Sequence, residues 1–66
     1  MPTVRVEIFA GRTQEIKKAL GLAITETVVK HIGCPAQAVT VIIDEVQKEN
    51  WIIGGKPCSE LFPEIR

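Results

Sequence analysis

Near the start of the chain, apolar and polar residues alternate over Thr3–Phe9. Val4, Val6 and Ile8 fall on one side of an extended backbone, and mostly polar residues fall on the other. This alternation is typical of a strand that buries one face. Gly11 follows the segment and ends the pattern, so we predict a first strand with one apolar side.

The longest predicted element is a helix over residues Gln14–Ile32, where apolar residues recur at helical spacing. Thr13 is its predicted N-cap, because the hydroxyl can accept a hydrogen bond from a free amide of the first turn. Gly33 is the predicted left-handed C-cap, and Pro35 prevents the helix from continuing. The apolar stripe consists of Ile16, Leu20, Ala23, Ile24, Thr27, Val28 and His31. We expect this stripe, His31 included, to cover the sheet.

A second strand is predicted over Ala38–Val46, which is rich in β-branched residues. Strand, helix and strand form a βαβ unit, whose right-handed crossover makes the two strands parallel. The apolar segment 51–53 and Gly54-Gly55 predict a small hairpin, and segment 56–66 has too much proline for a long regular element. The sequence therefore predicts an α/β fold in one domain, residues 1–66, with a single βαβ unit and a C-terminal β-hairpin.

Size and pattern together predict self-association. Two strands and one helix leave sheet edges unpaired and one sheet face uncovered. A chain of 66 residues buries only about 60% of its unfolded surface, which leaves little margin for a stable monomer. We expect two copies to complete a four-stranded sheet by dimerisation, so that each subunit is half of a fold.

Composition excludes several classes of protein. Eight basic residues balance eight acidic ones, so no long-range field would attract nucleic acid or an anionic membrane. No apolar run approaches the ~20 residues of a membrane span. Cys34 and Cys58 follow no secretory signal, which predicts reduced thiols in a cytoplasmic protein. A lone His31 with two separated thiols lacks the spacing of a zinc site, so we expect neither a metal nor a cofactor.

Pro2 and Arg12 are the candidate catalytic residues, one at each end of the first strand. If Met1 is removed, the ring nitrogen of Pro2 is a free secondary amine; at any other position it would be acylated and non-basic. A free α-amino group has a pKa near ~8, and burial against apolar walls lowers that pKa. Such an amine can act as a general base at neutral pH. The plainer interpretation is that Pro2 simply begins a strand and that Arg12 is a solvated turn residue.

The order and spacing of these pieces resemble the 4-oxalocrotonate tautomerase family over nearly the whole chain. The resemblance rests on Met1-Pro2, on Gly11-Arg12 after the first strand, on the long helix, on Val41-Ile42-Ile43-Asp44-Glu45 and on Trp51-x-Ile53-Gly54-Gly55. It implies a tautomerase fold, similar to that of macrophage migration inhibitory factor (MIF-like). It also implies an isomerase that moves a proton in 2-hydroxydienoates or other enol and keto acids.

The resemblance also implies a role for each candidate residue. Pro2 would be the catalytic base and acid, Arg12 would bind the substrate carboxylate, and Trp51 would line an apolar pocket. Thr40 stands where the best-known members carry a second arginine, and a hydroxyl lacks the charge and two-pronged geometry of guanidinium. A dicarboxylate is therefore expected to be a poor substrate. Ile53, in an apolar pair, favours proton transfer in a dry pocket over hydration.

Family members associate as dimers that form hexamers, with sites shared between subunits. The resemblance thus implies a homo-oligomer, a trimer of dimers, that acts on a small enol or keto acid. Arg5 and Lys56 are candidates for the missing cation. The alternative is a non-catalytic oligomeric module of the same fold, in which Met1 is retained and Pro2 is an amide.

Overall fold

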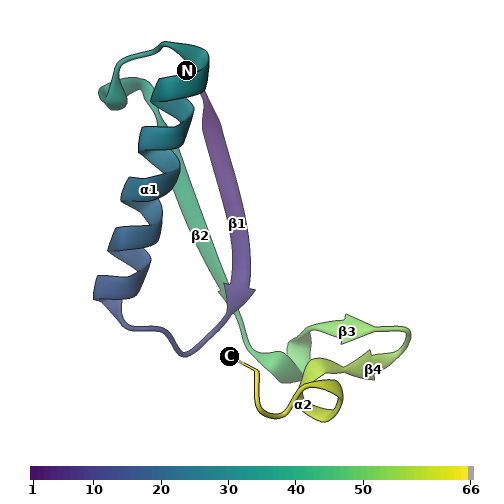
Figure 1. Cartoon of the computed structure of the whole chain (residues 1–66). Coiled ribbons are helices and arrows are strands. Elements are labelled where there is room, and N and C mark those ends of the chain that lie inside the picture. Colours follow the sequence, from purple (N-terminus) through teal and green to yellow (C-terminus); the bar gives the residue numbers. More distant parts are fainter. Residues whose placement is uncertain (66) are drawn as a thin grey trace.

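The computed structural model of the protein describes residues 1–65, and its elements follow the predicted order (Figure 1). They are β1 (Thr3–Phe9), α1 (Gln14–Ile32), β2 (Thr40–Val46), β3 (Ile52–Ile53), β4 (Lys56–Pro57) and α2 (Cys58–Leu61), with 3₁₀ turns at Ala36–Ala38 and Lys48–Asn50. The predicted βαβ unit and C-terminal hairpin are therefore confirmed. The short helix α2 fits the expectation that the tail holds no long regular element.

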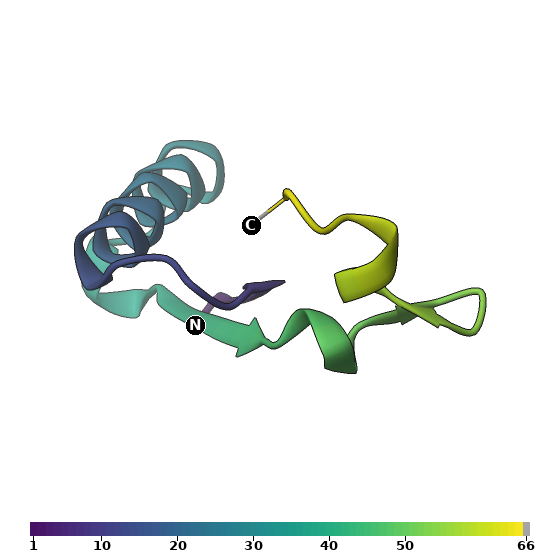
Figure 2. The ribbon, with the colours of Figure 1, turned by 90° about the horizontal axis from the view of Figure 1, so that it is seen from below.

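β1 and β2 form a two-stranded parallel sheet, as the crossover predicts. Their register runs from Thr3 opposite Thr40 to Phe9 opposite Val46. α1 lies on one face of this sheet and packs over β2 (Figure 2). Among residues 1–65, β1 and β2 pair only with each other, which leaves both outer edges of the sheet unpaired. Pairing with a second copy stays a prediction.

The second strand begins two residues later than predicted, at Thr40 rather than Ala38. The N–H of Ala38 donates to the carbonyl of Pro35 at 2.9 Å, and the N–H of Val39 donates to the carbonyl of Ala36 at 3.1 Å. A 3₁₀ turn after Pro35 thus takes the amides that a strand would use. The β-branched composition of the segment could not show where that turn ends.

Both predicted caps of α1 are confirmed. The Thr13 hydroxyl accepts a hydrogen bond from the N–H of Ile16 at 3.3 Å. Gly33 is left-handed, with φ 80°, and its N–H donates to the carbonyl of Val29 at 2.9 Å. Within residues 1–65, no helix is both long and apolar enough to cross a membrane.

The apolar stripe of α1 covers the sheet only in its middle part. Ile24 and Val28 are half-buried, but Ile16 is 53% exposed and His31 is exposed too. The expectation that the whole stripe covers the sheet is therefore wrong for the single chain. The reason is that α1 lies over β2 and leaves the part of its stripe that faces β1 uncovered. An apolar groove of about 310 Å³ results. It is lined by Val4, Ala23, Ile24, Thr27 and Val28.

The chain is elongated and has almost no interior of its own. Its radius of gyration is 14.6 Å, whereas a compact domain of this length has about 11 Å. It exposes 4940 Å², against roughly 4,200 Å² for a compact monomer of this mass. Among the described residues, Cys58 alone is buried. Within residues 1–65 the chain therefore buries little of its apolar surface, and the predicted pairing stays a prediction.

The hairpin extends away from the βαβ unit (Figure 1). β3 and β4 pair antiparallel, with Ile52 opposite Pro57 and Ile53 opposite Lys56. Gly54 and Gly55 form the loop with φ 59° and 84°. Two successive positive φ angles suit the tightest hairpin turns, which glycine adopts without steric cost. The reversal predicted at Gly54-Gly55 is confirmed.

Candidate active site

Pro2 lies just before β1 and is half-buried, while Met1 is 91% exposed. The backbone N–H of Thr40 donates to the carbonyl of Pro2 at 3.0 Å. This bond attaches Pro2 to β2 through its carbonyl group. The ring nitrogen takes no part in the hydrogen bonding between the two strands. Because parallel strands begin at the same edge of a sheet, Pro2 and Thr40 lie together there.

Arg12 lies at the other end of β1, in the turn that leads to α1. Its Nη1 donates to the carbonyl of Phe9 at 3.1 Å, and its side chain is half-buried. Before it, the N–H of Ala10 donates to the carbonyl of Val46 at 2.9 Å, so this part of the turn stays attached to β2. Gly11 has φ 122°, a conformation that favours glycine. A cavity of about 230 Å³ here is lined by Gly11, Arg12, Thr13 and Ile16.

Trp51 packs edge-on against Phe9, with ring centroids 4.9 Å apart and planes at 73°. Lys48 Nζ lies 5.6 Å from the centroid of the Phe9 ring and donates to the carbonyl of Phe62 at 2.7 Å. Phe9 therefore contacts Trp51 through its ring and Arg12 through its carbonyl. The sequence prediction missed Phe9, although an aromatic residue on the polar side of an alternating strand, next to a Gly-Arg turn, was a usable signal.

Glu45 connects β2 to the start of α1 beside this turn. Its Oε1 accepts a hydrogen bond from Lys17 Nζ at 2.7 Å. That hydrogen bond is the main reason why the pKa of Glu45 lies below its ordinary value of 4.5. Partial burial acts in the opposite direction, while the charge of Lys17 and a hydrogen bond from the backbone N–H of Gly11 lower the pKa further. The carboxylate is thus held in its charged form.

The remaining predicted residues lie on the hairpin and on the open sheet face. Ile53 is 51% exposed on β3, opposite the exposed Lys56 of β4. Arg5 Nη1 forms an ion pair with Asp44 Oδ2 at 2.6 Å. By strand alternation this pair lies on the sheet face away from α1. The two candidates for the missing cation are therefore Arg5, on the open sheet face, and Lys56, on the hairpin.

Pro2 and Arg12 are separated by the whole of β1 (Figure 1). At about 3.3 Å per residue, this seven-residue strand puts roughly 20 Å between its ends. One chain thus contains two groups of candidate residues and does not bring them together. We call Pro2 and Thr40 the proline end of the sheet. Phe9, Arg12 and Trp51 form the arginine end.

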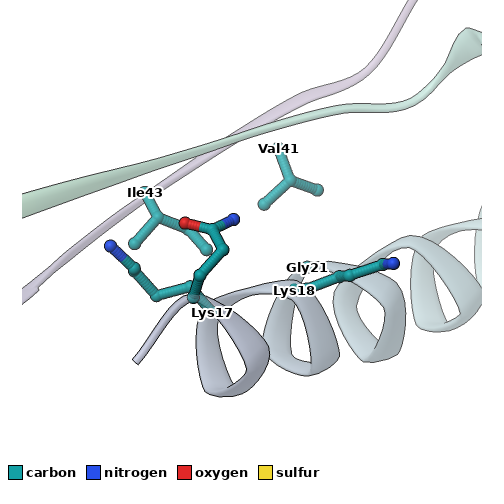
Figure 3. A pocket seen from close by; sticks show the side chains of 6 residues that line it. Lys17, Lys18, Gly21, Val41 and Ile43 are labelled. Atoms are coloured by element: carbon teal, nitrogen blue, oxygen red, sulfur yellow. The ribbon is translucent and has the colours of Figure 1, made fainter. Parts of the chain in front are cut away.

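A further hollow of about 350 Å³ lies between α1 and β2. Figure 3 shows Val41 and Ile43 pointing from β2 toward the helix, with Lys17 and Lys18 on the helix side. The hollow is lined by Gln14, Lys17, Lys18, Gly21, Val41 and Ile43. It contains none of the predicted site residues. Within residues 1–65, no group of three or more His, Cys, Asp or Glu is placed to hold a metal ion.

Comparison with known proteins gives one consistent result. A family model described as "Tautomerase enzyme" matches residues 2–60. A probable tautomerase from Streptococcus pneumoniae serotype 4 is 45% identical over 56 residues, which cover 85% of this chain and 93% of the relative. The 2-hydroxymuconate tautomerase of Comamonas testosteroni is 39% identical over 61 residues, which cover 92% of this chain and 97% of the relative.

Solved structures agree with these relatives. The 4-oxalocrotonate tautomerase isozymes from Methylibium petroleiphilum include a chain with a TM-score of 0.85 and 36% identity, covering 92% of this chain and 98% of that one. The heterohexamer 4-oxalocrotonate tautomerase from Chloroflexus aurantiacus gives a TM-score of 0.85 at 31% identity, with the same coverage of 92% and 98%. Sequence and backbone are thus similar to the same group of enzymes over most of the chain.

Proposed function

Because this chain belongs to the 4-oxalocrotonate tautomerase family, we propose that it is an isomerase with Pro2 as its general base and acid, acting on small unsaturated enol and keto acids. The observation that carries this proposal is the position of Pro2. The residue lies before the first strand, and its carbonyl accepts a hydrogen bond from the N–H of Thr40. Once Met1 is removed, the ring nitrogen is therefore free to exchange a proton without breaking a ladder hydrogen bond.

In the proposed reaction, Pro2 takes the hydroxyl proton of a 2-hydroxydienoate and returns a proton to a carbon further along the conjugated system. Arg12 holds the carboxylate. Negative charge builds on the conjugated oxygens in the transition state, so a fixed guanidinium stabilises that state more than the ground state. Trp51 and Ile53 supply apolar walls that disfavour the charged form of the proline amine.

The site is proposed to form between copies of the chain. A strand length of roughly 20 Å separates the proline end from the arginine end, so one substrate can meet both only if they come from different subunits. The open sheet edges and the elongated shape support this assembly. We propose a homo-oligomer of dimers, and the related heterohexamer from Chloroflexus aurantiacus supports association of three such dimers.

The substrate is proposed to carry one carboxylate beside the enol. The relative named 2-hydroxymuconate tautomerase suggests the 2-hydroxydienoate class. Thr40, which lies exposed at the proline end, offers a hydroxyl in place of a second guanidinium. A hydroxyl forms a weaker hydrogen bond to a second carboxylate than a charged donor does, so a monocarboxylate is expected to be the better substrate.

The test combines intact mass with an ultraviolet absorbance assay on 2-hydroxydienoates. We expect the purified protein to lack one methionine, and Pro2→Ala to lower kcat by about 10²-fold to 10⁴-fold, the usual contribution of a general base. Pro63→Ala, in the exposed tail, is the matched control and is expected to keep full activity. Retained Met1, or a fully active Pro2→Ala, would overturn the proposal and favour the non-catalytic module.

A further inference from the structure

Lys48 lies beside the arginine end of the sheet, in the 3₁₀ turn that follows β2. Its Nζ is 5.6 Å from the centroid of the Phe9 ring, within the range at which an ammonium group is attracted to an aromatic face. The same Nζ donates to the carbonyl of Phe62 at 2.7 Å. Phe9 thus contacts two cations, Lys48 through its ring and, through its carbonyl, Arg12, whose Nη1 is 3.1 Å away. Both positive charges border the same residue at the end of β1.

The charge of Lys48 has no acidic partner in the described part of the chain. The ion pairs of residues 1–65 join Arg5 to Asp44 and Lys17 to Glu45, whereas Lys48 contacts a neutral carbonyl and an aromatic ring. Lys48 is also half-buried, and a charge that has lost part of its hydration is most stable beside a charge of opposite sign. An ammonium group has three donors, so its one hydrogen bond to a carbonyl leaves donors for an anionic ligand.

The proposed substrate class carries two oxygen-bearing groups at one end. In a 2-hydroxydienoate, the carboxylate carbon is bonded directly to C2, the carbon that carries the hydroxyl. When Pro2 takes the hydroxyl proton, negative charge develops on the oxygen at C2. A guanidinium that holds the carboxylate in two-pronged fashion leaves this neighbouring oxygen to another donor. The compact ammonium group of a lysine, on its flexible stem, suits a single oxygen of this kind.

We propose that Lys48 binds the oxygen at C2 of the substrate while Arg12 of the same chain binds the adjacent carboxylate. The inference rests on the proposed function, because it names the group that stabilises the charge formed when Pro2 acts as the base. The cations named from the sequence are less suited, since Arg5 is already in an ion pair and Lys56 is exposed on the hairpin. Charge on the C2 oxygen grows toward the transition state, so the contact with Lys48 raises kcat.

Two acids that differ in the oxygen at C2 test the inference without turnover. 2-Oxopentanoate has a carboxylate and an oxygen at C2, whereas pentanoate has the carboxylate alone. In calorimetric titrations of the assembled protein, Lys48→Met is expected to weaken binding of 2-oxopentanoate by about 10-fold, and binding of pentanoate by less than about twofold. Unchanged binding of 2-oxopentanoate, or an equal loss for both acids, would overturn the inference. Lys30→Met, in the exposed last turn of α1, removes the same charge and is expected to change neither affinity.

Turnover separates this contact from a purely structural role, because Lys48 also holds the Phe62 carbonyl. Lys48→Met is expected to lower kcat for a 2-hydroxydienoate by about 10²-fold, with a smaller change in KM. Lys48→Gln keeps an N–H donor for the Phe62 carbonyl but loses the charge, and it is expected to be as slow as Lys48→Met. Wild-type kcat in Lys48→Gln would mean that the lysine only holds the tail.

The acid pair also keeps the inference separate from the proposed function. If Pro2→Ala retains full activity, the proposed function fails, and the binding of the two acids still decides whether Lys48 recognises the oxygen at C2. If the wild-type protein binds 2-oxopentanoate no more tightly than pentanoate, the inference fails even where Pro2 proves to be the base.

Discussion

The two ends of the β1–β2 sheet differ in how much of their surroundings the chain itself supplies. At the arginine end, side chains contact one another: Phe9 packs on Trp51, Arg12 reaches the Phe9 carbonyl, and Lys17 pairs with Glu45. At the proline end, one backbone hydrogen bond joins Pro2 to β2, and Thr40 is exposed. The chain thus surrounds the proposed carboxylate-binding group with its own side chains and leaves the proposed base half-buried.

This difference shows which part of the site depends on assembly. An amine stays uncharged near neutral pH only where water is limited, because the charged form is favoured by hydration. Pro2 is only half-buried within the described part of the chain, and the aromatic side chains of the other end are roughly 20 Å away along the strand. A neighbouring subunit is therefore expected to lower the pKa of the Pro2 amine by excluding water from it. The contacts of the Arg12 turn, in contrast, are already present in the single chain.

The largest effect is expected when two inactive variants are mixed, which tests whether the two ends of one site come from different subunits. Pro2→Ala and Arg12→Ala, unfolded and refolded together, are expected to regain activity, because some sites combine an intact proline end with an intact arginine end. Random assembly of a shared site predicts roughly a quarter of wild-type activity. Each variant refolded alone is the control. Absence of any recovery in mixed oligomers would mean that both residues act within one chain.

Thr40→Arg tests the role of charge at the proline end by adding a cation there. Charge-assisted hydrogen bonds to carboxylates are about twice as strong as neutral ones. We expect kcat/KM for a 2-hydroxydienoate with two carboxylates to rise by roughly 10-fold, which corresponds to about 1.4 kcal/mol. Thr40→Gln, similar in reach but uncharged, is expected to give little of this gain. A rise of equal size for a monocarboxylate would contradict the role assigned to position 40.

Phe9→Leu probes the organisation of the arginine end. Leucine keeps an apolar side chain but loses the edge-on contact with Trp51, and such aromatic contacts contribute about 0.5–1.5 kcal/mol. We expect the free energy of unfolding, measured in urea at fixed protein concentration, to fall by about 1 kcal/mol. Phe62→Leu, in the exposed tail segment, is the comparison variant. A loss of equal size there would mean that the Phe9–Trp51 contact has no special weight.

Lys17→Met gives the smallest expected effect, a change in pH dependence. Without its main hydrogen-bond donor, the pKa of Glu45 should rise toward its ordinary value of 4.5, which carboxyl carbon NMR titration can follow. A lowered pKa in the folded state stabilises the fold above the ordinary value, and this contribution is lost as the pH falls through the folded value. The difference in stability between wild type and variant should therefore be present at neutral pH and disappear in acid.

The local order of the chain could be predicted from the sequence because each element has a local cause. The alternation in β1, the Thr13 and Gly33 caps and the Gly54-Gly55 reversal all depend on neighbours within a few residues. The start of β2 could not be placed, because the turn after Pro35 competes for the same backbone amides. Local signals therefore fixed the type of each element better than its limits.

The candidate site was predictable only as separate residues. Pro2 and Arg12 were proposed from their positions in the chain, but the contact between Phe9 and Trp51 joins segments more than forty residues apart. The ion pair between Glu45 and Lys17 likewise joins a strand to a helix that lies 28 positions away in the sequence. Neither the contact nor the ion pair has a signal in hydrophobic periodicity. The exposure of His31 was missed for a related reason. The spacing of apolar residues predicts which side of α1 is apolar, but it does not predict how much of that side the sheet of one chain can cover.

The exposed Met1 has a consequence for how the enzyme would mature. The residue is 91% exposed, and the nearest backbone attachment is made by the carbonyl of Pro2, on the far side of the bond that an aminopeptidase would cut. Trimming would therefore leave the hydrogen bond from Thr40 to Pro2 in place. The subunit is thus expected to fold first and to become active afterwards, when removal of Met1 frees the Pro2 nitrogen without changing the fold.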